Sequence, residues 1–200
     1  MSGKEERHEK NHKILFPKPG NMLYPVPAVM VSCADKSGRS NILTVAWAGT
    51  ICSDPPMVSI SVRKSRFSHD MIRDTGEFVI NLTTEKLMKA ADFCGVRSGR
   101  NIDKWKACGL TVAEATEVSV PLILESPVNI ECRVTQMLEL GSHDMFLATV
   151  VAVDADSQYM DSQGRFHLEE AGLITYSHGK YFSLGKNLGF FGCSVQKKRR

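Results

Sequence analysis

A short stretch of the chain holds residue types that bind anions. Arg63, Ser65 and Ser68 fall within the run Arg-Lys-Ser-Arg-Phe-Ser, between an expected strand and an expected helix. Helix N-terminal amides, two hydroxyls and a guanidinium can together bind a phosphate or another oxyanion. The same spacing also fits a serine that caps the helix beside cations that face solvent. Because capped helices are common, the spacing alone favours this second interpretation.

A second cationic segment lies further along the chain. Residues 95–103 are rich in glycine and contain Arg97, Ser98 and Arg100, and Lys104 follows them. These residues could form another wall of an anion site. Without further information, a flexible exposed loop is the better interpretation of this composition.

Other common catalytic patterns are missing from the sequence. It has no glycine-rich dinucleotide fingerprint, no P-loop, no nucleophile elbow and no zincin motif. The six cysteines are scattered without Cys-x-x-Cys spacing, which excludes the usual zinc and iron–sulfur patterns and indicates a reducing compartment. Single histidines without fixed partners are more typical of structural positions than of catalysis. His143 is of interest because the turn-like segment 141–144 would place it at the mouth of two strands.

The elements that must position these residues are mostly strands. Apolar or alternating runs bounded by turn residues predict strands over 28–34, 42–51, 57–62, 77–82, 128–134 and 145–153, and a late hairpin over 173–182. A slip in the alternation at residues 136–137 predicts a β-bulge. Two short helices are expected, one capped by Ser68 and ended by Gly76, the other capped by Thr83 or Thr84 and ended by Gly95. This order predicts a mainly β protein, a small barrel with short helical insertions.

Length and composition allow one globular domain with tails. The chain has 200 residues, of which 42% are apolar and 24% charged. We expect a mobile lead-in over 1–21, a domain over 22–195 and a basic tail over 196–200. The formal net charge is +3, but Lys197, Lys198, Arg199 and Arg200 contribute four positive charges, and residues 14–196 sum to −2. We expect a soluble cytoplasmic protein that binds neither nucleic acid nor a membrane.

Taken in order, these pieces resemble the flavin reductase-like, FMN-binding split-barrel family, in its flavoredoxin-like branch. The likeness covers roughly residues 22–195, and the order of the runs carries it more than any single run does. The matching runs are Asn41-Ile-Leu-Thr-Val-Ala-Trp47, Ser53-Asp-Pro-Pro56, Ser59-Ile-Ser-Val-Arg-Lys-Ser-Arg-Phe-Ser68, Glu77-Phe-Val-Ile-Asn-Leu82, Cys94-Gly-Val-Arg-Ser-Gly-Arg-Asn-Ile-Asp-Lys104, Ser126-Pro-Val-Asn-Ile-Glu-Cys132, Gly141-Ser-His-Asp144 and Gly189-Phe-Phe-Gly192.

The resemblance implies a role for each candidate residue. The FMN phosphate would be held by Arg63, Ser65 and Ser68, and Lys104 would add charge to it. The strand that runs beside the isoalloxazine ring, and bonds it through backbone amides, would contain Asn41, Thr44, Val45, Ala46 and Trp47. His143 would lie near the edge of the nicotinamide or flavin, although a plain turn residue is a slightly better interpretation of its position.

Two functions remain open at this stage. One is an NAD(P)H-dependent reductase of flavin or another small acceptor, in which a hydride moves from the nicotinamide to flavin N5. The other is a flavoredoxin-type electron-transfer protein that holds FMN permanently and is reduced by a protein partner. The resemblance also implies a homodimer with the cofactor near the subunit interface.

Overall fold

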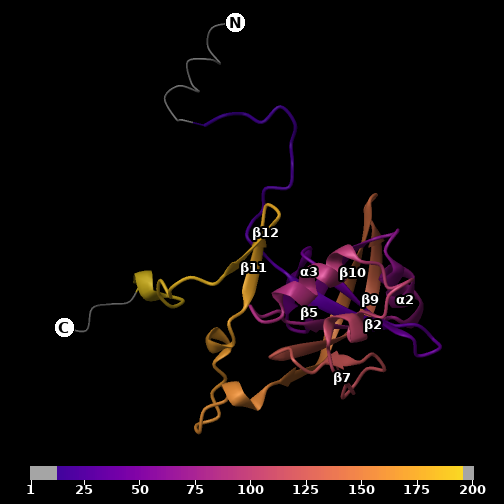
Figure 1. The fold of residues 1–200 in the computed structure, drawn as a ribbon. Coiled ribbons are helices and arrows are strands. Elements are labelled where there is room, and N and C mark those ends of the chain that lie inside the picture. The colour runs from indigo at the N-terminus through magenta and orange to yellow at the C-terminus, as the bar shows by residue number, and fades with distance from the viewer. Residues whose placement is uncertain (1–12, 196–200) are drawn as a thin grey trace, which may run out of the picture.

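Seven antiparallel strands form the main sheet of the computed structural model, which describes residues 13–195 (Figure 1). Their order in the sheet is β3-β2-β6-β9-β10-β5-β4. The strands are β2 (Val29–Ala34), β3 (Ser40–Val45), β4 (Ala48–Ser53), β5 (Pro56–Arg63), β6 (Glu77–Asn81), β9 (Val128–Glu139) and β10 (His143–Ala155). The prediction of a mainly β, split-barrel-like architecture is confirmed.

The sheet wraps around one apolar core. Alternate residues of β2, Val29, Val31 and Cys33, point into this core together with Ile60 of β5 and Phe146 of β10. Met30, between them, packs on the other side of β2 against the helices. Both faces of β2 are therefore buried, which explains why its sequence is apolar except at Ser32, whose hydroxyl donates a hydrogen bond of 2.6 Å to Pro121 O.

Three short helices cover part of the sheet: α2 (Phe67–Thr75), α3 (Met88–Val96) and α4 (Lys104–Cys108). The first begins near the predicted place and ends at Gly76 in the left-handed conformation, as expected. The predicted caps of α3 are wrong. Its N-cap is Leu87, not Thr83 or Thr84, and Gly95 lies inside it. A Cβ added at Gly95 would lie 3.3 Å from Thr44 Cβ, so the helix packs closely against β3 at this residue.

The predicted strand over 42–51 is two strands. β3 ends at Val45 and β4 begins at Ala48, so that Ala46 and Trp47 form the link between them. Trp47 O still accepts a hydrogen bond of 2.8 Å from Ser61 N, which keeps the link beside β5. The expected bulge is present one residue earlier than predicted, because Gln136 pairs with Leu147 and Val134 pairs with Ala148.

Smaller elements lie at the ends of the described chain. A three-stranded sheet contains β1 (Val26–Pro27), β11 (Ile174–Ser177) and β12 (Lys180–Ser183), and a two-stranded one contains β7 (Val112–Ala113) and β8 (Leu122–Ile123). The short helices η1 (Ser157–Tyr159), η2 (Leu168–Ala171) and η3 (Cys193–Val195) follow β10. Figure 1 shows that the segments before β1 and after β12 extend away from the main sheet.

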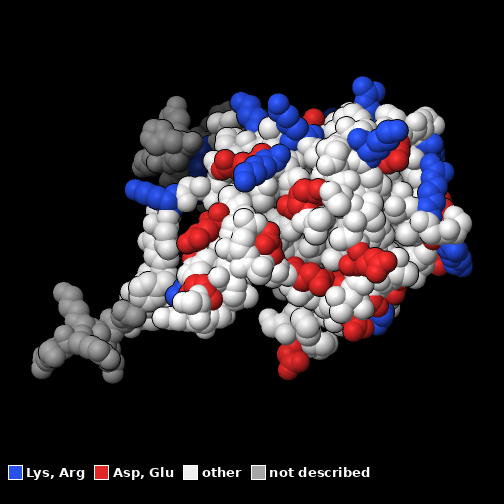
Figure 2. All heavy atoms as spheres, turned by 60° about the horizontal axis from the view of Figure 1, so that its bottom comes forward, with Lys and Arg blue, Asp and Glu red and all other residues white. Residues whose placement is uncertain are grey.

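The predicted lead-in and tail are covered only in part. Residues 13–21 contain no helix or strand, while residues 1–12 and the basic tail over 196–200 lie outside the described residues. Within 13–195, no helix is both long and apolar enough to cross a membrane. On the face in Figure 2, Asp and Glu side chains are spread over the middle, and Lys and Arg side chains gather along the upper and right-hand edges.

Candidate functional site

The predicted anion-binding residues surround one cavity of about 430 Å³. It lies between β3, the turn that joins β5 to α2, and the loop between α3 and α4. None of the described residues that line it is acidic, and five are basic. The lining consists of Asn41, Leu43, Arg63, Ser65, Arg66, Phe67, Ser68, Arg97, Ser98, Gly99, Arg100 and Lys104. The structure thus brings both cationic segments of the sequence together.

Ser68 reaches the cavity in a different way from the one predicted. The N-cap of α2 is Arg66, which makes no side-chain capping bond, so the prediction that Ser68 caps the helix is wrong. Ser68 is instead the second helical residue, is 1% exposed, and its hydroxyl accepts a hydrogen bond of 2.8 Å from Asn41 Nδ2. The amide and the hydroxyl join β3 to α2 at the base of the cavity.

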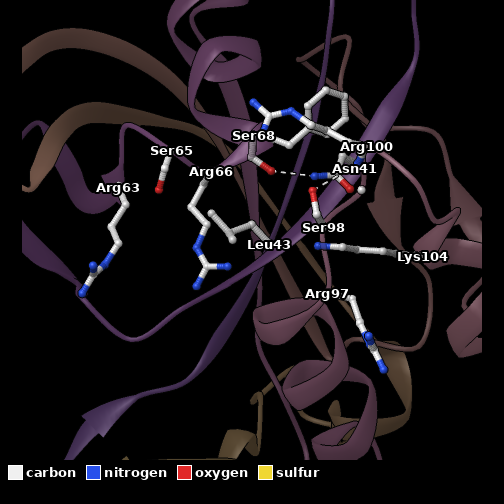
Figure 3. A pocket seen from close by; sticks show the side chains of 12 residues that line it. Asn41, Leu43, Arg63, Ser65, Arg66, Ser68, Arg97, Ser98, Arg100 and Lys104 are labelled. Atoms are coloured by element: carbon white, nitrogen blue, oxygen red, sulfur yellow. Dashed lines mark hydrogen bonds between the residues drawn. The ribbon is translucent and has the colours of Figure 1, made fainter.

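Arg66 is a cavity residue that the sequence interpretation missed. Figure 3 shows its side chain extending past Leu43, while the guanidinium of Arg63 points away from Ser68. Both arginines line a neighbouring cavity as well. Arg66 could have been predicted from the sequence, because it stands two residues before Ser68 in the same run. It was missed because the N-cap of the helix was assigned to Ser68 and not to Arg66.

The cationic loop is held against the sheet. Gly99 is buried, and an added Cβ would lie 1.9 Å from Asn41 Oδ1. Arg39 Nη2 donates hydrogen bonds to Gly99 O at 2.9 Å and to Arg100 O at 3.3 Å. The guanidinium carbons of Arg39 and Arg100 lie 4.8 and 5.5 Å from the centre of the Phe67 ring. These contacts fix the loop as a wall of the cavity.

Lys104 is buried and already has partners. Its Nζ donates to Ile42 O at 2.6 Å and to Cys94 O at 2.8 Å, and the residue is 3% exposed. Burial lowers the pKa of its amine, and the nearby thiols of Cys94 and Cys33 oppose that shift. Lys104 therefore joins β3, α3 and α4 and contributes positive charge at the cavity wall.

A narrower cavity of about 140 Å³ continues from the first one along the end of β3. Leu43, Arg63 and Arg66 line both. The remaining lining residues are Thr44, Val45, Ala46, Trp47, Ser61, Val62 and His143. The predicted ring-binding strand and the predicted phosphate-binding residues are therefore parts of one groove.

A third cavity, of about 720 Å³, opens at the far end of the groove. It shares Trp47, Ser61, Arg63 and His143 with the second cavity. The segment before β1 forms its other side, and its lining also includes Gly20, Asn21, Met22, Leu23, Val26, Leu140 and Ser142. This end of the groove is wider and more apolar than the cationic end.

His143 lies between the second and third cavities. It is the first residue of β10 and pairs with Arg63 of β5. Its Nδ1 lies 2.9 Å from Ser142 Oγ. Burial and the positive charges of Arg63 and Arg66 lower the pKa of the imidazole below its usual value of 6.5. At neutral pH, the His143 ring is therefore uncharged.

A cluster of hydrogen bonds and ion pairs around the buried Asp144 supports the turn between β5 and α2. His69 Nε2 lies 2.8 Å from Asp144 Oδ2, and both side chains are less than 5% exposed. Lys64 Nζ lies 3.4 Å from Asp144 Oδ1 and 2.7 Å from Glu139 Oε2. The cluster fixes α2 and the turn to β10, next to His143. Sequence reasoning missed it because the partners are 75 residues apart.

The chain is similar to known proteins in both sequence and structure. Residues 22–185 match the family described as the flavin reductase like domain. A protein of Archaeoglobus fulgidus is 30% identical over 165 residues, which cover 82% of this chain and 88% of that protein. An NADH:riboflavin 5′-phosphate oxidoreductase of Streptomyces pristinaespiralis is 24% identical over 132 residues. This match covers 64% of this chain and 69% of that protein.

Among solved structures, flavoredoxin of Desulfovibrio vulgaris (Miyazaki F) superposes with a TM-score of 0.84 and 26% identity. The match covers 92% of this chain and all of that one. The family match spans the main sheet, the helices and every cavity-lining residue from Met22 onward. The chain therefore belongs to the flavin reductase like family, whose general function is flavin-dependent oxidation and reduction.

Proposed function

We propose that the protein binds FMN and acts as an NAD(P)H-dependent reductase of flavin or of another small acceptor. The observation that carries the proposal is the continuous groove, which is cationic at one end, narrow along β3 and wide beside His143. Bound flavin would supply the chemistry, since its ring accepts a hydride from a reduced nicotinamide and passes electrons onward.

The cationic end fits the phosphate of FMN. Arg63 and Arg66 bring guanidinium groups, Ser65 and Ser68 bring hydroxyls, and α2 begins beside them. Arg97, Arg100 and Lys104 supply further positive charge from the other wall. A cavity without acidic lining residues suits a dianion, because each carboxylate there would oppose binding.

The narrow part fits a flat ring. Residues 43–45 end β3, an edge strand of the main sheet, and residues 46–47 link it to β4, so that some backbone groups of this segment are not paired within the sheet. These groups can donate to the carbonyl and nitrogen edge of a flavin. Trp47 and Ser61 then separate the narrow part from the wide cavity, where His143, Met22 and Leu23 would enclose the nicotinamide or the acceptor.

The second candidate is an electron-transfer protein that keeps FMN bound. The structural likeness to flavoredoxin favours it, at 26% identity over nearly the whole chain. In this case a protein partner would deliver electrons, and NAD(P)H would not be needed.

We also propose that the protein is a homodimer. The segments before β1 and after β12 leave the main sheet, and they expose the large apolar side chains Leu15, Leu23, Leu188, Phe190 and Phe191. Exposed apolar surface of this kind favours a protein partner. A second copy of the chain is the simplest occupant because Leu23 and its neighbours also line the groove, which the second subunit would then cover.

One experiment separates the two candidates. FMN-loaded protein is mixed anaerobically with NADH or with NADPH, and the flavin absorbance is followed. Bleaching at a rate that rises with nucleotide concentration supports the reductase. An absorbance that stays constant with both nucleotides, but bleaches with dithionite, supports the electron-transfer protein and contradicts the reductase.

A further inference from the structure

Two cysteine sulfurs meet beside the cationic loop. Cys94 Sγ and Cys108 Sγ lie 4.0 Å apart, and both side chains carry free thiols. Cys94 belongs to α3 and is fully buried, whereas Cys108 is the last residue of α4 and is partly exposed. Within residues 13–195, no other two cysteine sulfurs lie in contact. Cys33, for example, contacts the thioether of Met71, which cannot form a disulfide.

We propose that Cys94 and Cys108 form a reversible disulfide when a hydroperoxide oxidises the protein, and that this bond ties α3 to α4 around the cationic loop. A disulfide needs a sulfur separation of about 2.05 Å, so the two sulfurs must approach by about 2 Å. Helix α4 can supply this movement, because it has five residues and ends at Gly109 in the left-handed conformation.

The position of each thiol sets the order of steps. The partly exposed Cys108 meets the peroxide first: its sulfur takes one oxygen, the O–O bond breaks, and water leaves. The Cys94 sulfur then attacks the resulting sulfenic acid, the S–O bond breaks, and a second water carries away the thiol proton. Two thiols and one hydrogen peroxide thus give one disulfide and two waters. Burial and the neighbouring Cys108 raise the pKa of the Cys94 thiol to about 12, so Cys94 reacts poorly with peroxide itself. Its attack on the sulfenic acid is favoured by the contact between the two sulfurs and not by thiolate character.

The disulfide would enclose the second wall of the anion cavity. Residues 95–107 include Arg97, Ser98, Arg100 and Lys104, and the Lys104 amine is bonded to the backbone of Cys94 itself. A covalent bond across the ends of this segment restricts its motion. Less conformational entropy is then lost when an anion binds, so binding tightens. This effect rests on the proposed function, whereas formation of the disulfide does not.

Peptide mapping tests the disulfide on the protein without flavin. After treatment with hydrogen peroxide and alkylation of remaining thiols, trypsin releases Cys94 in peptide 90–97 and Cys108 in peptide 107–133. We expect these two peptides to be joined, two hydrogens lighter than their sum, and to separate with dithiothreitol. Because peptide 107–133 also contains Cys132, the link must vanish in Cys108→Ser and persist in Cys132→Ala. Alkylated or over-oxidised Cys94 and Cys108 without a link would overturn the proposal.

A second measurement tests the effect on the groove. FMN affinity is compared between peroxide-treated and untreated protein, with Cys108→Ser treated in the same way as the control. We expect oxidation to tighten FMN binding by about 2- to 10-fold in the wild type and to leave the variant unchanged. If the mapped disulfide forms without changing FMN affinity, the link to the groove is wrong. If neither sample binds FMN, the proposed function fails while the disulfide stands.

Discussion

Arg63 and Arg66 leave the same turn but face different parts of the groove. Arg66 lines the cationic and the narrow cavity, and Arg63 lines all three. The guanidinium of Arg63 points away from Ser68 (Figure 3), so it can also contact the ring or the donor. One residue change in this turn can therefore affect both cofactor and substrate, and measurements on it must separate the two.

His143 offers that separation, because it lies outside the cationic cavity. We expect His143→Ala to raise the KM for NAD(P)H and to change FMN affinity much less, since His143 lines the narrow and the wide cavity but not the cationic one. Burial and two arginines lower the pKa of His143, so its ring gains its charge only at acidic pH. The ratio of KM between variant and wild type should therefore grow as the pH falls, because a charged ring attracts the phosphates of the nucleotide.

Steady-state kinetics from pH 5.5 to 8 would measure this ratio, with His167→Ala as the control, since His167 does not line the groove. Identical kinetics for His143→Ala and the wild type at every pH would reduce His143 to a turn residue.

At the scale of elements, the loop between α3 and α4 must lie close to β3. Gly99→Ala places a Cβ 1.9 Å from Asn41 Oδ1, and Asn41 in turn donates to Ser68. We expect a loss of about 1 to 3 kcal/mol in stability and weaker FMN binding, because the loop must move away from the strand. Thermal unfolding and FMN titration would show both effects. Gly49→Ala is the matched control, since a Cβ there meets no atom within 4 Å. Equal behaviour of the two variants would mean that the loop packs differently.

A second element depends on a buried carboxylate. Glu131 of β9 is fully buried and accepts hydrogen bonds from the backbone N–H groups of Thr116, Glu117 and Val118 at 2.7 to 2.9 Å. Burial alone would raise the pKa of this carboxyl, but the backbone donors outweigh it and the pKa is lowered. Charged Glu131 therefore stabilises the fold at neutral pH, and this contribution is lost as the pH falls through its lowered pKa.

We expect Glu131→Gln to cost about 1 to 3 kcal/mol at pH 7, because the amide cannot accept all three bonds and brings a donor of its own. The cost should shrink as the pH falls, since the wild-type carboxyl then becomes protonated too. Denaturant unfolding at several pH values measures this, beside Glu114→Gln on the exposed part of the same segment. A cost that stays constant down to pH 3 would contradict the assignment.

Local patterns in the sequence predicted most strands but not how the site is assembled. β2, β5 and α2 lie within two residues of their predicted bounds, because alternation and turn residues act locally. The break at Ala46 and Trp47 was missed, since both residues suit a strand and only pairing with β5 reveals the link. The burial of Gly99 and the bonds of Lys104 depend on contacts between residues about 60 apart in sequence. The resemblance to a family, and not spacing, brought the two cationic segments together.

At the scale of the whole molecule, the two ends of the described chain are the least buried parts. Phe190 and Phe191 are both exposed, in a segment that leaves the main sheet (Figure 1). We expect the wild-type chain of 22.2 kDa to behave as a dimer in light scattering. Replacing both phenylalanines by serine should shift the protein toward the monomer, because apolar area is lost from the interface. Val153→Ser, which removes an exposed apolar residue from β10, serves as control. A wild-type protein that is monomeric at all concentrations would contradict the homodimer.

The groove as a binding site for a phosphorylated flavin is the central claim, and a paired titration with FMN and riboflavin tests it most directly. Quenching of flavin fluorescence measures both affinities, for the wild type and for Arg63→Ala and Arg66→Ala. We expect the wild type to bind FMN at least about tenfold more tightly than riboflavin, and each variant to weaken FMN by about 1.5 to 3 kcal/mol, the range for a hydrogen bond to a charged group. Riboflavin binding should weaken less than FMN binding in Arg66→Ala, because Arg66 lines both the cationic cavity and the cavity proposed for the ring. Equal affinity for the two flavins, or equal weakening of both in Arg66→Ala, would contradict the phosphate site.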